Sequence, residues 1–173
     1  MIRADQHLVL VGMMGVGKST IGRIVAERLG RALIDTDAAV EHEAGRTVRE
    51  IFATEGEASF RARESAALAV ALDSEPPAVI ATGGGVVLAD RNRQLLEGVT
   101  ARVVWLSAEP STLVERLRTS SSGTGSRPLL DGDAEGTLQR MCAEREALYR
   151  SVADAIVRVD QRSVSDVVEA VLR

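Results

Sequence analysis

The sequence predicts an α/β fold in which helices cover both faces of a parallel sheet. Two observations lead to this prediction. Short apolar runs of strand length alternate along the chain with segments whose apolar residues recur at helical spacing. Near the N-terminus a strand, a glycine-rich loop and a helix follow one another, which is an order typical of α/β proteins. With 173 residues, the chain is expected to form one domain, residues 1–173.

The first strand leads into a loop with the spacing of a phosphate-binding motif. The apolar run from His7 to Val11 predicts a strand, and a helix is predicted from about Lys18 until Gly30 ends it. Residues 12–20 between them read Gly-Met-Met-Gly-Val-Gly-Lys-Ser-Thr, which matches G-x-x-x-x-G-K-[ST]. Glycines let backbone N–H groups approach phosphate oxygens, and the helix N-terminus adds further donors. An ordinary glycine-rich turn is the weaker alternative.

The side chains of this loop suit a nucleoside triphosphate with Mg²⁺. The chain has 21 basic residues, and Lys18 is its only lysine. A compact ammonium suits the β and γ phosphates, and the Ser19 hydroxyl can bind Mg²⁺. The residues expected to bind the nucleotide are Gly15, Val16, Gly17, Lys18, Ser19 and Thr20.

The other elements are predicted from periodicity and from signals for helix start and stop. Thr47 and Glu50 form a capping box, and Pro110 suits the first position of a helix. The predicted strands are residues 32–35, 78–82, 102–107 and 155–159. The predicted helices are residues 37–43, 47–52, 57–73, 90–97, 110–118, 134–151 and 163–172. Ligands of such folds bind outside the carboxyl ends of the strands, so the functional candidates should gather at that edge.

Composition excludes several classes of function. The net charge of -4 argues against a general nucleic-acid or anionic-membrane surface. No apolar run reaches the length of a membrane span, and Asp5 and His7 stand where a signal peptide would be apolar. A single cysteine, Cys142, excludes an internal disulfide. We therefore expect a cytoplasmic protein, and a monomer because no apolar stripe is left over.

Several charged or glycine residues are candidates for chemistry. Asp35 and Asp37 follow a predicted strand, where they could bind Mg²⁺ and accept a proton, although either could simply cap a helix. Arg61 could grip a carboxylate, or pair with acidic neighbours on its own helix. Gly83-Gly84-Gly85 suggests close approach to a ligand.

The segment 119–128 is rich in Ser and Gly and has too little apolar content to fold by itself. Arg127 near its end could swing onto a transferring phosphoryl group, and a plain surface loop is the alternative. Arg145 and Tyr149 lie one helical turn apart and could equally be a pair that covers the sheet.

Taken in order, these motifs resemble shikimate kinase over nearly the whole chain. The resemblance rests on residues 12–20, Asp35-Thr36-Asp37, Ile51-Phe52 through Gly56-Glu57 to Phe60-Arg61-Ala62-Arg63-Glu64, Gly83-Gly84-Gly85, Arg127-Pro128-Leu129-Leu130, and Arg145 with Tyr149. It implies a three-layer P-loop kinase fold of the nucleoside monophosphate kinase type, with a five-stranded parallel sheet. It also implies a substrate-binding region at about 36–64 and a lid at about 119–133.

The resemblance implies transfer of the ATP γ-phosphate to the 3-hydroxyl of shikimate, with Mg²⁺, in aromatic amino-acid biosynthesis. Lys18, Asp37 and Arg127 would be catalytic, with Asp37 as candidate base, and Ser19 and Asp35 would hold the metal. Arg61 and Arg145 would bind the substrate carboxylate, supported by Glu64. Asp37, Gly83, Gly84 and Gly85 would contact the rest of shikimate, and Arg118 and Arg162 would lie beside adenine.

Three alternatives stay open at this point. A kinase of the same fold could act on another polyol acid such as gluconate, although Arg61, Arg145 and the triple glycine argue against it. A nucleotide-gated switch is a different class, but the guanine-reading Asn-Lys-x-Asp pattern is absent because no lysine follows Lys18. A relative that binds without turnover is the third.

Overall fold

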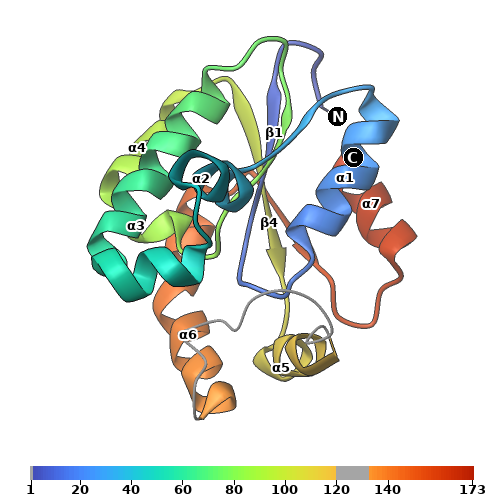
Figure 1. The fold of residues 1–173 in the computed structure, drawn as a ribbon. Coiled ribbons are helices and arrows are strands. Elements are labelled where there is room, and N and C mark those ends of the chain that lie inside the picture. The colour runs from blue at the N-terminus through green and yellow to red at the C-terminus, as the bar shows by residue number, and fades with distance from the viewer. Residues whose placement is uncertain (1, 120–132) are drawn as a thin grey trace.

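The computed structural model describes residues 2–119 and 133–173 and contains a five-stranded parallel sheet flanked by helices (Figure 1). The strand order is β2-β3-β1-β4-β5, and each neighbouring pair is parallel. In the central register Val9 lies opposite Ile80 on one side and Val103 on the other. The strands are β1 His7–Val11, β2 Leu33–Asp35, β3 Val79–Ala81, β4 Ala101–Ser107 and β5 Ala155–Arg158. The predicted fold class is confirmed.

Helices cover both faces of this sheet, as a parallel sheet requires. In Figure 1, α1 and α7 lie side by side on one face, and α3, α4 and α6 lie on the other. Among the described residues, no helix combines the length and apolar character needed to cross a membrane. The helices are α1 Lys18–Leu29, α2 Thr36–Ala44, α3 Val48–Leu72, the 3-10 turn η1 Val86–Leu88, α4 Asp90–Gly98, α5 Pro110–Thr119, α6 Ala134–Val152 and α7 Val164–Leu172.

Two local features differ from the sequence prediction. The predicted helices 47–52 and 57–73 form one element, α3, which turns sharply at Gly56 without an intervening loop. Gly56 has φ 82° and ψ 173°, which is outside the helical region. The 3-10 turn η1 was not predicted, because its short apolar stretch shows no helical period. The capping box at Thr47 and the start of α5 at Pro110 are confirmed.

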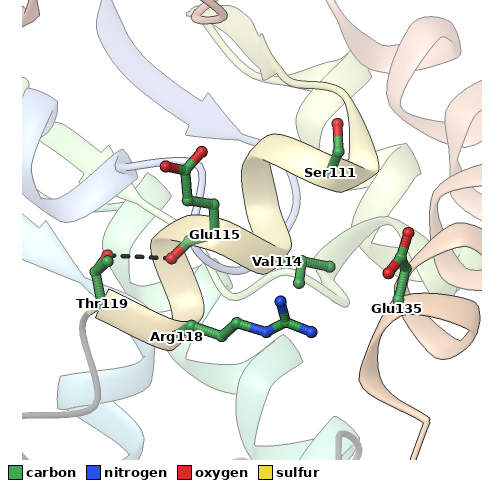
Figure 2. A pocket seen from close by; sticks show the side chains of 6 residues that line it. All are labelled: Ser111, Val114, Glu115, Arg118, Thr119 and Glu135. Atoms are coloured by element: carbon green, nitrogen blue, oxygen red, sulfur yellow. Dashed lines mark hydrogen bonds between the residues drawn. The ribbon is translucent and has the colours of Figure 1, made fainter.

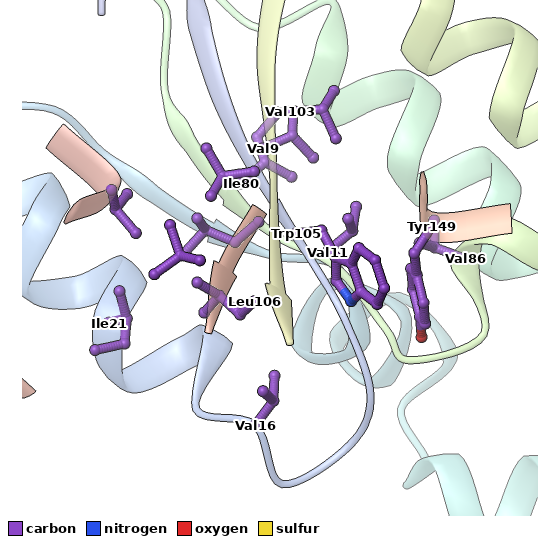
Figure 3. Packing of buried hydrophobic residues seen from close by; sticks show 14 of the residues in the cluster. Val9, Val11, Val16, Ile21, Ile80, Val86, Val103, Trp105, Leu106 and Tyr149 are labelled. Atoms are coloured by element: carbon purple, nitrogen blue, oxygen red, sulfur yellow. The ribbon is translucent and has the colours of Figure 1, made fainter. Parts of the chain in front are cut away.

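The described residues form a large hydrophobic core and a small hydrophobic cluster. Leu8, Val9, Leu10 and Val11 of β1 are fully buried, as expected for a strand covered on both faces. Figure 3 shows this core with Trp105, whose ring stacks on Tyr149 at a centroid distance of 5.6 Å. The small cluster lies between α2 and the first part of α3 and contains Val40, Ile51 and Phe60.

Candidate active site

The phosphate-binding loop occupies the carboxyl end of β1, the central strand. Gly12, Gly15 and Gly17 all have positive φ, so the backbone takes a path that other residues rarely follow. Lys18 begins α1 and is 8% exposed. Its ammonium folds back over the loop and donates hydrogen bonds to the carbonyls of Gly12 at 2.7 Å and Met13 at 3.0 Å. The charge therefore lies against the first two residues of the loop.

Asp35 links this loop to α2. Its Oδ1 accepts hydrogen bonds from the backbone N–H groups of Asp37 at 3.1 Å and Ala38 at 3.3 Å, so it is the N-cap of α2. Its Oδ2 accepts a hydrogen bond from Ser19 Oγ at 2.6 Å. The capping interpretation of Asp35 is therefore confirmed, whereas its role at the metal stays a prediction. A carboxylate beside a hydroxyl at the phosphate loop is a donor set that fits Mg²⁺, which takes one or two protein oxygens and completes its shell with phosphates and water.

Two carboxylates, the half-buried Asp37 and the buried Glu64, lie against Gly83. A Cβ atom on Gly83 would lie 2.6 Å from Asp37 Oδ1 and 2.4 Å from Glu64 Oε1, so only glycine fits. The Gly83 N–H is held by Thr36 Oγ1 at 3.1 Å. Asp37 Oδ1 and Glu64 Oε1 have no hydrogen-bond partner within the described part of the chain. Buried acceptors usually have a hydrogen-bond partner, so these two oxygens are sites that a donor from a ligand could satisfy on reaching them.

The electrostatics of this pair follow from burial. Loss of water raises the pKa of Asp37, and the nearby Lys18 and Arg61 oppose that rise. Burial likewise raises the pKa of Glu64, against the opposing effect of Arg61. An Asp with a raised pKa is a better proton acceptor than an exposed one, which is what a general base requires.

Arg61 and Arg145 approach the same glycine tract from two helices. On α3, Arg61 donates to Glu64 at 2.8 Å and to Glu57 at 3.1 and 3.2 Å, so the helical ion pairs considered from the sequence are present. Its guanidinium lies against Gly85, where a Cβ would be 2.1 Å from Nη1. On α6, Arg145 is 5% exposed and donates to the Gly84 carbonyl at 3.0 Å.

The glycine tract also contacts the phosphate loop. A Cβ on Gly84 would lie 3.0 Å from the backbone nitrogen of Met14. The Tyr149 hydroxyl donates to the same Gly84 carbonyl as Arg145, and burial raises the pKa of that phenol. Tyr149 therefore stays a hydrogen-bond donor. The tract joins the amides that could hold phosphate to the two guanidiniums that could hold a carboxylate.

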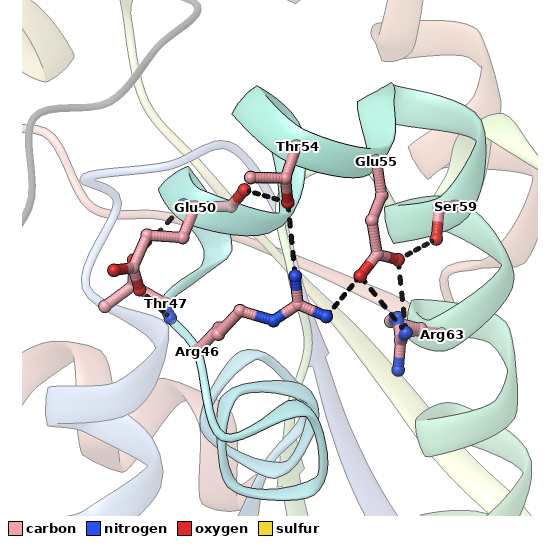
Figure 4. A network of polar contacts seen from close by, with 7 residues as sticks. All are labelled: Arg46, Thr47, Glu50, Thr54, Glu55, Ser59 and Arg63. Atoms are coloured by element: carbon pink, nitrogen blue, oxygen red, sulfur yellow. Dashed lines mark hydrogen bonds and ion pairs between the residues drawn. The ribbon is translucent and has the colours of Figure 1, made fainter.

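A polar network braces the part of α3 that carries Arg61 (Figure 4). Glu55 accepts hydrogen bonds from Arg46 at 2.5 Å, from Ser59 at 2.6 Å and from Arg63 at 3.1 Å. Arg46 lies before the helix, Glu55 before the kink, and Ser59 and Arg63 after it. The network thus holds the two halves of α3 at a fixed angle.

Three arginines are predicted from the sequence to contact the nucleotide, and the structure describes two of them, Arg118 and Arg162. Arg118 borders a pocket of about 360 Å³ between α5 and the start of α6, and Figure 2 shows it extending toward the side of Glu135. Arg162 lies exposed in the turn between β5 and α7. Arg127, with nearly all of the predicted lid, is outside the described residues. The roles of these three arginines stay predictions.

Sequence reasoning missed several supporting residues. Thr36 holds the Gly83 amide, and the Asp-Thr-Asp sequence could have drawn attention to it. Glu55 and Arg63 lie eight residues apart across a kink, so helical spacing alone does not pair them. Arg116 was also missed, because a sequence does not reveal which face of α5 meets the phosphate loop.

Comparisons with known proteins agree with this geometry. The family model described as "Shikimate kinase" matches residues 14–173. A shikimate kinase of Symbiobacterium thermophilum is 48% identical over 96% of this chain and 94% of its own length. The structure of shikimate kinase from Acinetobacter baumannii, solved with shikimate, is 34% identical and has a TM-score of 0.89, over 96% of this chain and 90% of that one.

One comparison addresses the gluconate alternative. A gluconokinase of Sinorhizobium meliloti is 20% identical with a TM-score of 0.54, over 98% of this chain and 91% of that one, a likeness of fold alone. The identity of 48% to a shikimate kinase along almost the whole chain decides between the two. The chain therefore belongs to the shikimate kinase family, ATP-binding phosphotransferases of the shikimate pathway.

Proposed function

We propose that the protein transfers the γ-phosphoryl group of ATP to the 3-hydroxyl of shikimate, with Asp37 as the proton acceptor. The observation that carries this assignment is the position of Gly83-Gly84-Gly85. The tract contacts Asp37 at Gly83, the phosphate loop residue Met14 at Gly84, and Arg61 at Gly85. A flat acid resting on these glycines would have its carboxylate at the arginines and its hydroxyls toward Asp37 and the phosphates.

Recognition of the acid rests on two guanidiniums. Arg61 and Arg145 would bind the shikimate carboxylate, since a guanidinium fork matches a carboxylate in shape and charge. Arg61 is already oriented by Glu57 and Glu64, so little side-chain freedom is lost on binding. The Asp37 and Glu64 oxygens that have no partner in the described residues would accept hydrogen bonds from the substrate hydroxyls. These bonds would replace the ones to water that the two carboxylates lose on burial.

The reaction needs alignment and neutralisation of charge more than covalent help from the protein. The 3-hydroxyl oxygen attacks the γ-phosphorus, the bond to the ADP oxygen breaks, and the hydroxyl proton passes to Asp37 Oδ1. Lys18 and the amides of residues 15–20 would hold the phosphates, with Arg127 arriving from the lid. Arg118 and Arg162 would contact the adenine.

Ser19 and Asp35 would hold Mg²⁺, and their 2.6 Å hydrogen bond supports this role. When bound, the ion would neutralise part of the charge on the β and γ phosphates. We further propose that the protein acts as a cytoplasmic monomer, as one kinase domain whose region 36–64 binds the acid.

Substitution of Arg61 tests the assignment. Arg61→Ala should raise the KM for shikimate by at least about tenfold, because a charge-assisted pair is lost, while the KM for ATP stays near the wild-type value. The measurement is a coupled assay of ADP release with and without shikimate, repeated with gluconate.

The matched control is Arg49→Ala, which removes an exposed arginine from the same helix. This control should leave both KM values unchanged. Equal turnover of gluconate, or an Arg61→Ala enzyme with an unchanged KM for shikimate, would contradict the proposal.

A further inference from the structure

Arg116 joins the phosphate loop to the segment that follows β5. Its Nη1 donates a hydrogen bond to the carbonyl of Val16 at 3.1 Å, and its Nη2 donates to the carbonyl of Val159 at 3.4 Å. Val16 is the loop residue between Gly15 and Gly17, and Val159 directly follows β5. One half-buried side chain thus ties together parts of the chain that are 100 and 43 residues away from it.

The contact with Val16 controls the direction of the next amide. In a trans peptide the C=O and the following N–H share a plane and point in opposite directions. A guanidinium that holds the Val16 carbonyl on the α5 side therefore turns the Gly17 N–H toward the opposite side. In a phosphate-binding loop, amides of these positions must face the ligand.

The loop needs such a restraint because its glycines do not supply one. Gly17 has φ 104°, and the atom nearest to an ideal Cβ there, Ile21 Cγ1, is 4.0 Å away, so few atoms pack against this position. At the neighbouring Gly15 the nearest atoms to an ideal Cβ belong to Leu117, the residue after Arg116, with Cδ2 at 3.0 Å. A charge-assisted hydrogen bond is strong enough to select one peptide orientation.

The second contact explains why an arginine occupies this position. A guanidinium is a planar fork that can bond two carbonyls at once, whereas the single ammonium of a lysine is a point charge. By bonding Val159 as well, Arg116 is anchored to the sheet edge and cannot follow the loop if the loop moves. The Val159 side chain is almost fully buried, so the core fixes the end of this bridge that lies beyond the loop.

We propose that Arg116 is a positioning residue for the triphosphate, which presents the Gly17 amide to the phosphates by holding the Val16 carbonyl. The inference rests on the proposed role of residues 15–20 in binding ATP. It differs from the adenine contacts proposed for Arg118 and Arg162, because it requires no contact between Arg116 and the nucleotide.

The test compares Arg116→Met with a matched control, Arg31→Met. Arg31 also bridges backbone carbonyls with its guanidinium, those of Gln6, Arg3 and Ala4, at the opposite end of β1. Calorimetric titrations with tripolyphosphate, ADP and shikimate, each with Mg²⁺, give dissociation constants, and the coupled assay gives KM and kcat. Thermal unfolding reports whether each variant is folded.

For Arg116→Met we expect the dissociation constants of tripolyphosphate and ADP, and the KM for ATP, to rise by about tenfold, as for loss of a charge-assisted hydrogen bond. The affinity for shikimate alone should not change. Arg116→Lys keeps the charge but not the planar fork, so its dissociation constants for tripolyphosphate and ADP should lie between those of the wild type and those of Arg116→Met. This variant serves as the test if Arg116→Met does not fold. Arg31→Met should lower the melting temperature and leave all three dissociation constants unchanged.

Three results would overturn the inference: tripolyphosphate binding unchanged while ADP binding weakens, which would mean contact with the base; equal loss of shikimate and phosphate binding; or no difference from Arg31→Met. Failure of the proposed function is distinguishable, because it would appear in the wild-type protein as absent turnover of ATP with shikimate.

Discussion

At the scale of single residues, the charged carboxylate of Asp37 is expected to serve catalysis at a cost to the stability of the fold. Its carboxylate is needed to accept a proton, yet burial makes the charged form costly and raises its pKa above the ordinary 3.8. A group whose folded pKa is raised stabilises the fold only while protonated. Its contribution is present below the ordinary pKa and is lost as pH rises through the raised pKa.

Asp37→Asn should therefore lose kcat by orders of magnitude and gain thermal stability at neutral pH. The gain should shrink as the pH is lowered through the raised pKa, where the wild-type carboxyl becomes neutral too. Wild-type kcat/KM should fall over that same range, because the base is then protonated. Melting temperatures and kcat/KM measured from pH 8 downward check both parts.

The control is Asp73→Asn at the exposed end of α3, which should leave kcat unchanged because Asp73 lies outside the site. A turnover near that of the wild type in Asp37→Asn would remove this residue as base. A stability difference that is constant with pH would show that burial does not govern its charge.

Residue types predicted the main groups of the site, but not how they are held. Lys18, Asp35, Arg61 and the glycine tract could be identified because each occupies a motif position that its chemistry explains. Arg116 could not, since α5 carries two arginines two positions apart on nearly opposite faces, and only packing decides which one meets the phosphate loop.

At the scale of elements, the kink in α3 separates two functions of one helix. Ile51 before Gly56 and Phe60 just after it pack with Val40 of α2. The part after the kink also carries Arg61 and Glu64 and then joins the main core. The φ and ψ of Gly56 lie in a region that is essentially open to glycine alone. Sequence predicted an interruption here, but its angle comes from the Glu55 network.

Gly56→Ala should thus destabilise the protein by about 1–3 kcal/mol of backbone strain and raise the KM for shikimate, because Arg61 follows the kink. Gly45→Ala is the matched control. Both positions have no atom within 4 Å of an added Cβ, but Gly45 has φ 63° and ψ 20°, which other residues can adopt at lower cost. Denaturant unfolding and steady-state kinetics measure both effects.

A smaller loss of stability in Gly56→Ala than in Gly45→Ala would contradict this account of the backbone. Equal KM values for shikimate in the two variants would mean that the kink does not set the position of Arg61.

At the scale of the whole molecule, the fold was more predictable than the relations between its parts. The continuous apolar character of strands such as residues 7–11 predicts a parallel sheet covered on both faces. The phosphate-loop motif predicts that the ligand binds at the carboxyl ends of the strands. The sequence did not reveal that α2 and the first half of α3 have a hydrophobic cluster of their own. In the sequence, Val40, Ile51 and Phe60 are apolar positions of amphipathic helices, as are residues of the main core, so the pattern does not show which cluster each one joins.

This division predicts two levels of local stability. The main core is large and includes Leu68, Ala71 and Leu72 from the end of α3. By contrast, α2 and the start of α3 depend on the small cluster of Val40, Ile51 and Phe60. Segments with fewer buried apolar contacts open at lower free energy. In hydrogen exchange without ligand, amides of residues 36–55 should exchange well before those of β1 and β4.

Shikimate should slow that exchange, because Asp37 and Arg61 would join the two regions through the same ligand and opening would then require its release. ADP alone should protect the phosphate loop and α1, and should change the exchange of residues 36–55 less than shikimate does. Exchange at one common rate throughout the sheet and residues 36–55 would contradict the division into two clusters. Protection by shikimate confined to α1 would instead place the acid away from α2 and α3, and with it the carboxylate role of Arg61 would fail.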